Sequence, residues 1–522
     1  MNEPADQVLP RHRGTAFVLL LSIFVVATCG LVYELVAGTL SSYLLGDSVT
    51  QFSIVIGLFL TAMGLGSWLS RCCVRNLAAW FVGVEIGVGI FGGTVALVGF
   101  STFALTELFL PILVAQVVVI GTLVGLEIPL VIRLLRELET LRVTVARVLS
   151  VDYVGAFAAS IVFPFVLLPH MGLVRAALLA GLTNVLVGLV LLHWLRDVIG
   201  RAVRPMAWLG GAAAVVLVVL SVTAGGLTDW MEDRIYQDEI IFARNSAVQR
   251  VIVTRWKDDF RLYLNGHLQF SSVDEYRYHE ALVMPVMAAA SRRDRVLVLG
   301  GGDGMVVREV LRHPGVQSVD LVDLDPMVTN LFRDHALLAR LNDHSLVDPR
   351  VSIHNQDARK FLEGTHDAWD VVIMDLPDPS EASLGKLYAK SFFSLVGKHL
   401  AEGGAMSSQA TSPFRAREAF WCIVHSAEAA RWGLEDRMRL SVRAYHTVVP
   451  TFGTWGFLVA TTRPVDVAGL KPLVTGRYLN AELWPTLFRF PTDMAEVATP
   501  VSDLDDPVVC RLYRDGYHEY LE

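Results

Sequence analysis

The sequence contains little cysteine, and the cysteines that are present follow no functional spacing. There are five in 522 residues, and Cys29, Cys72 and Cys73 lie in the most apolar part of the chain. Neither a disulfide framework nor a set of metal ligands has this arrangement. We interpret Cys72 and Cys73 as a pair at the edge of an apolar segment, and we expect no metal.

The chain also lacks a basic stripe. Its 44 Lys and Arg residues are outnumbered by 52 Asp and Glu residues, which leaves a net charge of -8. Proteins that bind nucleic acid by its backbone need clustered positive charge. We therefore predict that nucleic acid is not a partner.

Apolar residues are abundant and unevenly distributed. The chain is 53% hydrophobic with a mean hydropathy of +0.47, and the excess falls in residues 14–225. Residues 226–522 have the mixed composition of a globular region. The first apolar run, from about Thr15 to Leu40, is too long for the core of a signal peptide and has no clear cleavage site. We expect at least two domains, the first of which lies in a lipid bilayer.

Seven apolar segments in the first half are each close to the length that crosses a bilayer as a helix. This length is about 20 residues. Small residues recur along them, such as Gly57, Gly64, Gly66 and Gly89, which favours close packing of helices. The predicted spans are residues 15–38, 51–70, 78–100, 109–132, 151–169, 173–194 and 206–224.

Arginine falls on alternate loops between these segments, as at Arg71, Arg142 and Arg201. On the other set of loops, Arg175 is essentially the only arginine. By the positive-inside rule, the N-terminus is cytoplasmic. Seven spans would then place the globular region on the opposite side of the membrane. A re-entrant or miscounted segment would reverse that placement, and the sequence leaves both alternatives open. The predicted location is the cell membrane, with multiple passes.

Acidic residues also occur inside the apolar segments, notably Glu34, Glu85 and Glu127. Ionisable groups in hydrocarbon are costly and often mark a functional site. For Glu34 and Glu127, a functional site and a purely structural role between helices are equally well supported.

The stretch from Arg295 to Asp325 is the strongest motif in the globular half. An apolar strand pattern meets Gly300, Gly301 and Gly302, a helical pattern follows, and a second apolar run ends at Asp323. Glycines allow the backbone to turn sharply beside a ligand, and the later acid can bind a ribose diol. The pattern therefore predicts a site for an adenosine-containing molecule.

Acids recur where later strands are predicted to end. Asp357 follows VSIHNQ, and Asp375 ends DVVIMD with Asp378 three residues further on. Since the carboxyl ends of parallel strands meet at one crevice, these acids should share a pocket with Asp303 and Asp323. A pocket so rich in carboxylates favours a cationic ligand.

Between the apolar half and this region, residues 230–270 alternate like short strands. Asn265-Gly266 is a strong signal for a tight turn, so a small antiparallel sheet is expected. A helix with Tyr278 and His279 should follow.

Taken together, these motifs resemble the spermidine synthase (polyamine aminopropyltransferase) family. The similarity covers about residues 230–490, and residues 1–225 resemble the membrane extension of some bacterial members. The resemblance implies a small β-domain followed by a class I methyltransferase-like, Rossmann-like domain. It also implies transfer of an aminopropyl group from decarboxylated S-adenosylmethionine to putrescine or a related amine, giving spermidine and methylthioadenosine.

The resemblance also implies roles for individual residues. Gln249, the Gly300–Gly302 loop and Asp323 would bind the donor nucleoside. Asp357 and Ala358 would lie at the adenine, although the family has glycine where this chain has Ala358.

In the reaction centre, the resemblance implies that Asp303 binds the amine end of the aminopropyl group. Asp375 would be the general base, and Asp378 would grip the far end of the acceptor. Tyr278 and His279 would line the substrate channel.

The chain departs from the family at three places. Val248 replaces a tyrosine, the Gly-Pro-Ala after Asp378 is absent, and Phe452 stands where the family has a tyrosine. The missing hydroxyl at Phe452 affects the predicted acceptor site more than the predicted donor site.

We predict a helical membrane bundle at 1–225, a small β-domain with a linking helix at 226–285, and a Rossmann-like catalytic domain at 286–522. The alternatives are a methyltransferase that uses intact S-adenosylmethionine, and a membrane protein that transports or senses polyamines without turnover. The predicted partners are a small amine and the lipid bilayer. The oligomeric state is open, with a homodimer as one form.

Overall fold

The computed structural model describes residues 13–45, 48–106, 108–136, 140–236, 238–246, 248–432 and 437–521. The chain divides into two compact units, Met1–Asp238 and Glu239–Glu522. The predicted boundary at residue 226 falls inside the last helix of the first unit, which continues to Tyr236.

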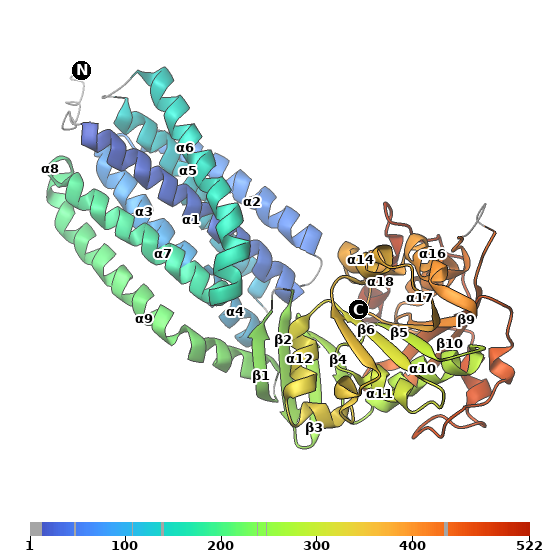
Figure 1. The fold of residues 1–522 in the computed structure, drawn as a ribbon. Helices are drawn as coiled ribbons and strands as arrows, with labels where there is room; N and C mark the ends of the chain where they lie inside the picture. The colour runs from blue at the N-terminus through green and yellow to red at the C-terminus, as the bar shows by residue number, and fades with distance from the viewer. Residues whose placement is uncertain are drawn as a thin grey trace. The chain divides into compact units, whose positions relative to one another are not determined.

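The described residues of the first unit form helices and the short turns between them (Figure 1). Helix α1 packs against α6 and α7, α2 packs against α5, and α3 packs against α7. The helices are α1 (Arg13–Leu45), α2 (Ser48–Leu69), α3 (Leu77–Gly93), α4 (Val95–Leu105), α5 (Phe109–Leu135), α6 (Leu141–Val162), α7 (Leu168–Trp194), α8 (Arg196–Ile199) and α9 (Val203–Tyr236).

Six helical stretches of the described chain are long and apolar enough to cross a membrane, compared with seven predicted segments. The difference lies in Leu141–Trp194, which counts as one stretch of 54 residues. A straight helix of that length would be about 80 Å long, more than twice the thickness of a bilayer core. The backbone leaves the helical conformation at Gly172, where φ is 72° and ψ is 175°. The chain therefore changes direction there, between the fifth and sixth predicted segments.

Glycines bring some of these helices into close contact, but not all of the glycines that we expected. A Cβ atom at Gly125 would lie 2.6 Å from the Cα atom of Met63, and one at Gly89 would lie 2.7 Å from the carbonyl oxygen of Gly181. By contrast, Gly57 and Gly64 have no neighbour within 4 Å of such an atom. The prediction that the latter two pack helices was wrong, because they face away from the bundle.

Two of the acids in the apolar segments lie inside the bundle. Glu85 is fully buried and Glu127 is 7% exposed. Neither carboxylate oxygen of Glu85, nor Oε1 of Glu127, has a hydrogen-bond partner. A functional role for Glu127 stays a prediction, and Glu85 deserves the same hypothesis because of its burial.

Side-chain contacts bring the arginine-bearing loops to one end of the bundle. The guanidinium of Arg133, at the end of α5, donates to the carbonyl oxygens of Ser70 and Cys73 after α2, at 3.0 and 2.8 Å. The amide of Asn76, before α3, donates to the carbonyl oxygen of Ile199 at 3.2 Å. The loops that carry arginine in the sequence are therefore neighbours in space.

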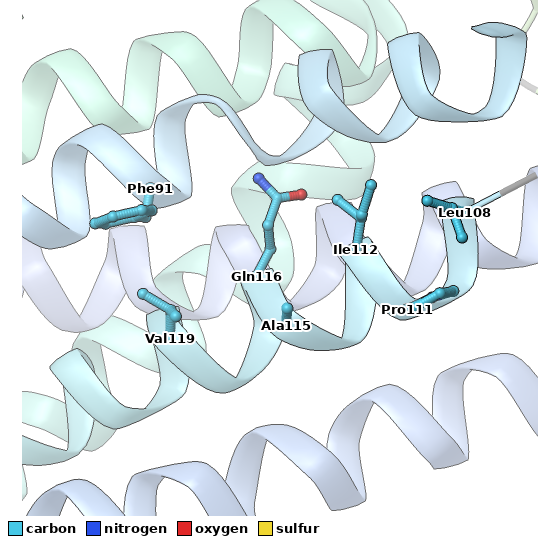
Figure 2. Close-up of a pocket in the computed structure, with 7 residues that line it drawn as sticks. All are labelled: Phe91, Leu108, Pro111, Ile112, Ala115, Gln116 and Val119. Carbon is cyan, nitrogen blue, oxygen red and sulfur yellow. The ribbon is translucent and has the colours of Figure 1, made fainter. Parts of the chain in front are cut away.

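A pocket of ~320 Å³ lies in the same unit, along α5. Figure 2 shows that Gln116 points between Phe91 and Ile112, and that the other side chains are apolar. Its lining is Phe91, Leu108, Pro111, Ile112, Ala115, Gln116 and Val119. Because this lining has no charged group, the pocket is a poor site for a charged amine.

The second unit begins with the small antiparallel sheet that the sequence predicts. Its strands run in the order β1-β2-β3-β4. Asn265 and Gly266 both have positive φ, 49° and 81°, as a tight turn between β3 and β4 requires. The strands are β1 (Glu239–Asn245), β2 (Arg250–Trp256), β3 (Asp259–Leu264) and β4 (His267–Ser271).

A seven-stranded Rossmann-like sheet follows, in the order β10-β11-β9-β8-β5-β6-β7 (Figure 1). Strands β5 to β9 are parallel, whereas β11 is antiparallel to both of its neighbours. The strands are β5 (Arg295–Gly300), β6 (Ser318–Asp323), β7 (Val351–Asn355), β8 (Trp369–Asp375), β9 (Leu400–Gln409), β10 (Ser441–Val449) and β11 (Gly453–Thr461).

Helices connect and cover these strands. The continuous apolar runs of β5 and β8 are buried on both faces, as expected for central parallel strands. The helices are α10 (Glu275–Ala289), α11 (Met305–Leu311), α12 (Pro326–Asp334), α13 (Leu338–Leu341), α14 (Ala358–Gly364), α15 (Ala382–Gly385), α16 (Lys390–Lys398), α17 (Arg417–Glu428) and α18 (Val508–Leu521).

Candidate active site

The glycine-rich loop lies directly against the end of the neighbouring strand. Strands β5 and β8 are adjacent, and Gly300 pairs with Asp375 in their register. Gly300 has a φ of 80°, and a Cβ atom there would collide with the carbonyl oxygen of Asp375. Only glycine combines this conformation with this approach. The loop can therefore turn beside the Asp375 carboxylate without a side chain between them.

Backbone N–H groups of the same loop hold two further acids. Asp323, at the end of β6, accepts from the N–H groups of Gly302 at 3.0 Å and Asp325 at 2.8 Å. Asp303 accepts from the N–H group of Met305 at 2.9 Å. Burial raises the pKa of Asp303 and of Asp323 to about 6, although these hydrogen bonds oppose the rise. Both remain mostly ionised at neutral pH.

The Asp375 carboxylate has one tyrosine partner and remains half-buried. The Tyr278 hydroxyl, from α10, donates to Oδ1 of Asp375 at 2.6 Å. The ring of Tyr278 is held by its contacts with His279 and Phe457, at centroid distances of 5.1 and 5.3 Å. Burial raises the pKa of Asp375, while the charge of His279 and the Tyr278 hydrogen bond oppose this shift. Asp375 is thus a stronger base than an exposed aspartate.

A buried chain of ionic contacts supports His279. Its Nδ1 atom lies 2.6 Å from Oε2 of Glu275, and the Arg308 guanidinium lies 2.9 Å from the same oxygen. Burial alone would raise the pKa of Glu275, but His279 and Arg308 lower it to about 2. Burial lowers the pKa of His279, but the hydrogen bond and charge of Glu275 outweigh burial and raise it. When it is protonated, His279 carries a positive charge that interacts with Asp303 and Asp375.

The groups that shift the pKa of Asp378 by hydrogen bonds to its carboxylate are all neutral. Gln409 donates to Oδ1 at 3.3 Å, and Thr411 donates to Oδ2 at 3.4 Å. Burial raises the pKa of Asp378 to about 6, and hydrogen bonds from Tyr513, Gln409 and Thr411 oppose the rise. The bonds from Gln409 and Thr411 are both long, so an ammonium group could bind this carboxylate more strongly than these partners do.

The loop that carries Asp375 and Asp378 is fixed from behind. The hydroxyl of the buried Tyr388 donates to the carbonyl oxygens of Leu376 at 3.1 Å and Pro377 at 2.8 Å. The side-chain amide of Gln409 also donates to the Leu376 carbonyl, at 2.7 Å. These bonds fix the backbone between Asp375 and Asp378, and with it the positions of the two acids relative to each other.

Two predicted donor-binding residues, Asp357 and Gln249, have partners within the protein. Asp357 caps α14 by accepting from the N–H group of Lys360 at 3.0 Å, and it pairs with Lys386 at 3.5 Å. Ala358 is the first residue of that helix. Gln249 donates to Oδ2 of Asp325 at 3.1 Å. Asp303, Asp323, Asp375 and Asp378 thus form the acidic group of the site, and the donor-binding roles of Asp357, Ala358 and Gln249 stay predictions.

Several important residues were missing from the predicted site. Asp325 was missed although the Asp-Pro pair at the start of α12 is typical of a helix N-terminus, where Asp325 accepts from Met327. Glu275 could have been found from its spacing of four residues before His279 on a helix. Gln409 and Tyr513 have no local signal, because their contacts depend on the tertiary fold.

The charge of the site suits an organic cation. Within the described ranges, no group of three or more His, Cys, Asp or Glu side chains is arranged to hold a metal. The charges of Asp303 and Asp323 both interact with that of Asp375. Clustered carboxylates with one histidine countercharge favour an organic cation at this edge of the sheet.

The chain is similar to known proteins of one family. A family model described as the spermine/spermidine synthase domain matches residues 275–468. Polyamine aminopropyltransferase 1 of Ralstonia nicotianae is 45% identical, covering 98% of this chain and 97% of its own. Polyamine aminopropyltransferase of Leptospira interrogans is 42% identical, covering 97% of this chain and 99% of its own. A crystal structure of spermidine synthase in complex with the transition state analogue AdoDATO is 24% identical with a TM-score of 0.44, covering 48% of this chain and 86% of its own.

Proposed function

The chain belongs to the polyamine aminopropyltransferase (spermidine synthase) family, and we propose that it transfers an aminopropyl group from decarboxylated S-adenosylmethionine to putrescine. The products would be spermidine and methylthioadenosine. The observation that carries this assignment is the group formed by Asp303, Asp323, Asp375 and Asp378, because both substrates are cations.

On the donor side, Asp303 would bind the ammonium group of the aminopropyl chain, and Asp323 would bind the ribose diol. Glycines at the end of β5 leave the backbone free to approach the nucleoside. We keep Asp357 and Ala358 as the proposed adenine contacts, since they follow β7 at the carboxyl edge of the sheet. Gln249 would act through Asp325, to which it is already hydrogen-bonded.

On the acceptor side, Asp375 would take the proton that the attacking amine must lose. Aliphatic amines have a pKa of about 10.4, so they arrive mostly protonated. A nearby sulfonium charge and the forming C–N bond both make the nitrogen more acidic. Asp378 would hold the second ammonium group of a diamine, while Tyr278 orients the base and His279 supplies a countercharge.

The acceptor can be identified by supplying decarboxylated S-adenosylmethionine with a panel of mono-, di- and triamines. We expect diamines to react with much higher kcat/KM than monoamines, because only diamines can use Asp375 and Asp378 together. Putrescine should rank first. Equal rates for butylamine and putrescine would contradict the role given to Asp378.

The acceptor affinity should depend on pH through Asp378. Since its pKa is about 6, lowering the pH below 6 neutralises the carboxylate and removes its attraction for an ammonium. At saturating donor, KM for putrescine should rise by about tenfold per pH unit in that range. In Asp378→Asn, KM should be high at pH 7 and nearly constant down to pH 5. A variant that retained the wild-type pH profile would show that another group controls acceptor binding.

We further propose that the first unit anchors the enzyme in the cell membrane, with the loops that carry Arg71, Arg142 and Arg201 in the cytoplasm. The apolar helical stretches and the grouping of arginine at one end support this arrangement. Reporter fusions after Arg142, after His170 and at the C-terminus would test it. The first should report cytoplasm and the second the opposite side. With seven crossings the C-terminal fusion should also report the opposite side, so a cytoplasmic signal there would mean that one predicted crossing does not occur.

A further inference from the structure

Helix α18 (Val508–Leu521) lies outside the matched family domain, which ends at residue 468, yet it is part of the catalytic unit's core. Val508, Val509 and Cys510 are buried. The Cys510 thiol donates to the carbonyl oxygen of Glu381 at 3.3 Å, in the loop that follows Asp378. The start of the helix is therefore anchored beside the loop that follows Asp378.

The second half of the same helix closely approaches the segment before α17. A Cβ atom at Gly516 would lie 2.7 Å from Cα of Ala416 and 2.9 Å from the carbonyl oxygen of Arg415. Tyr513 and Tyr517, one helical turn apart, flank this contact with ring centroids 4.6 Å apart. Gly516 thus allows α18 to lie close enough for both tyrosines to reach the site.

Both tyrosines interact with Asp378. The Tyr513 hydroxyl lowers the pKa of Asp378 by a hydrogen bond. Burial, followed by the charge of Asp378, raises the pKa of Tyr513 above its usual value and that of Tyr517 to about 12. Both side chains are therefore neutral phenols that can donate a hydrogen bond at neutral pH. Tyr517 in turn hydrogen-bonds to Thr411 and Tyr513.

The interactions follow a defined order through the site. Tyr278 interacts with both Asp375 and Asp378, whereas Tyr513 and Tyr517 interact with Asp378. The groups that shift the pKa of Asp375 are His279 and Tyr278. Helix α18 belongs to the hydrophobic core on the sheet face opposite α10, the helix that carries Tyr278, and it packs on α15 and α17. Tyr513 therefore approaches Asp378 from the face opposite the contact between Tyr278 and Asp375.

We infer that Tyr513 is a specificity-determining residue that ends the acceptor site and limits the length of the diamine. This inference rests on the proposed function. When an ammonium group binds Asp378, the Tyr513 hydroxyl can keep its bond to that carboxylate, and its ring can flank the cation. In this inference its bulk, backed by Tyr517 at a ring-centroid distance of 4.6 Å, blocks a longer chain from extending past Asp378.

Full-length protein in detergent or nanodiscs tests this with two variants and a series of diamines of three to six carbons. Tyr513→Phe removes the hydroxyl, so KM for putrescine should rise by about tenfold while kcat changes little. Tyr513→Ala opens the end of the site, so the ratio of kcat/KM for cadaverine to that for putrescine should rise by at least about tenfold, since one methylene is worth that much in a closed pocket.

Leu512→Ala is the matched control, because Leu512 packs on the apolar core from the same helix. It should leave the diamine ranking unchanged. If it shifted the ranking as Tyr513→Ala does, displacement of α18 would be the cause and the inference would be overturned. An unchanged ranking in Tyr513→Ala would overturn it too. A wild type that converts no amine would refute the proposed function itself, and the inference with it.

Discussion

Asp375→Asn is expected to lower kcat by about 10²–10⁴-fold, the usual cost of losing a general base. Asparagine has nearly the same shape, and its carbonyl oxygen can still accept from the Tyr278 hydroxyl, which now lies 2.6 Å from Oδ1. The backbone against Gly300 is unaffected. Affinity for methylthioadenosine should therefore change little. Steady-state kinetics with putrescine, together with calorimetry for the nucleoside, would measure both effects.

Asp334→Asn provides the control for that experiment. Asp334 is on α12, is 62% exposed and pairs with Arg333 on the surface. Its replacement should leave kcat and nucleoside affinity within error of the wild type. Near-normal turnover in Asp375→Asn would require a different base and would contradict the proposed mechanism.

Asp303→Asn is expected to weaken discrimination between the two possible donors. Intact S-adenosylmethionine carries a carboxylate that the decarboxylated form lacks, and a buried Asp303 would repel it. Such juxtaposition costs several kcal/mol, so the wild type should prefer the decarboxylated donor by about 10²-fold or more. Asp303 is 8% exposed with a pKa of about 6, and it is therefore charged at pH 7.5.

Calorimetry with each donor, on the wild type and on Asp303→Asn, would measure this discrimination. The variant should discriminate between the donors at least about tenfold less than the wild type, because the repulsion between Asp303 and the carboxylate of the intact donor is removed. A wild type that binds the two donors equally would show that Asp303 does not select the substrate.

Most of the fold follows from local patterns in the sequence. The runs that became β5, β6 and β8 are continuous and apolar because parallel central strands are buried on both faces. Asn265-Gly266 predicted the turn between β3 and β4 because few other pairs adopt positive φ twice. The extent of α9 was missed, since its last turns continue beyond the apolar segment. The orientation of Gly57 and Gly64 was also missed, because spacing alone does not identify which helix face meets a partner.

The site was predicted in part, and the reason is chain topology. Asp323 and Asp375 end the parallel strands on either side of β5, and Asp303 lies in the loop after β5, so knowledge of the strands was enough to bring them together. The residues whose charges and hydrogen bonds shift the pKa values of the site's acids come from distant segments. Glu275 and Arg308 belong to different helices, and Tyr513 lies 135 positions after Asp378. No sequence period connects such residues, so only the folded structure reveals their contacts.

The identity of the transferred group is the central claim, and one measurement tests it directly. The full-length protein would be incubated with putrescine and an equal mixture of decarboxylated and intact S-adenosylmethionine, and all products would be identified by mass. We predict spermidine and methylthioadenosine in equal amounts, with no methylated putrescine. Methylputrescine with S-adenosylhomocysteine as the main products, or no conversion of either donor, would contradict the account.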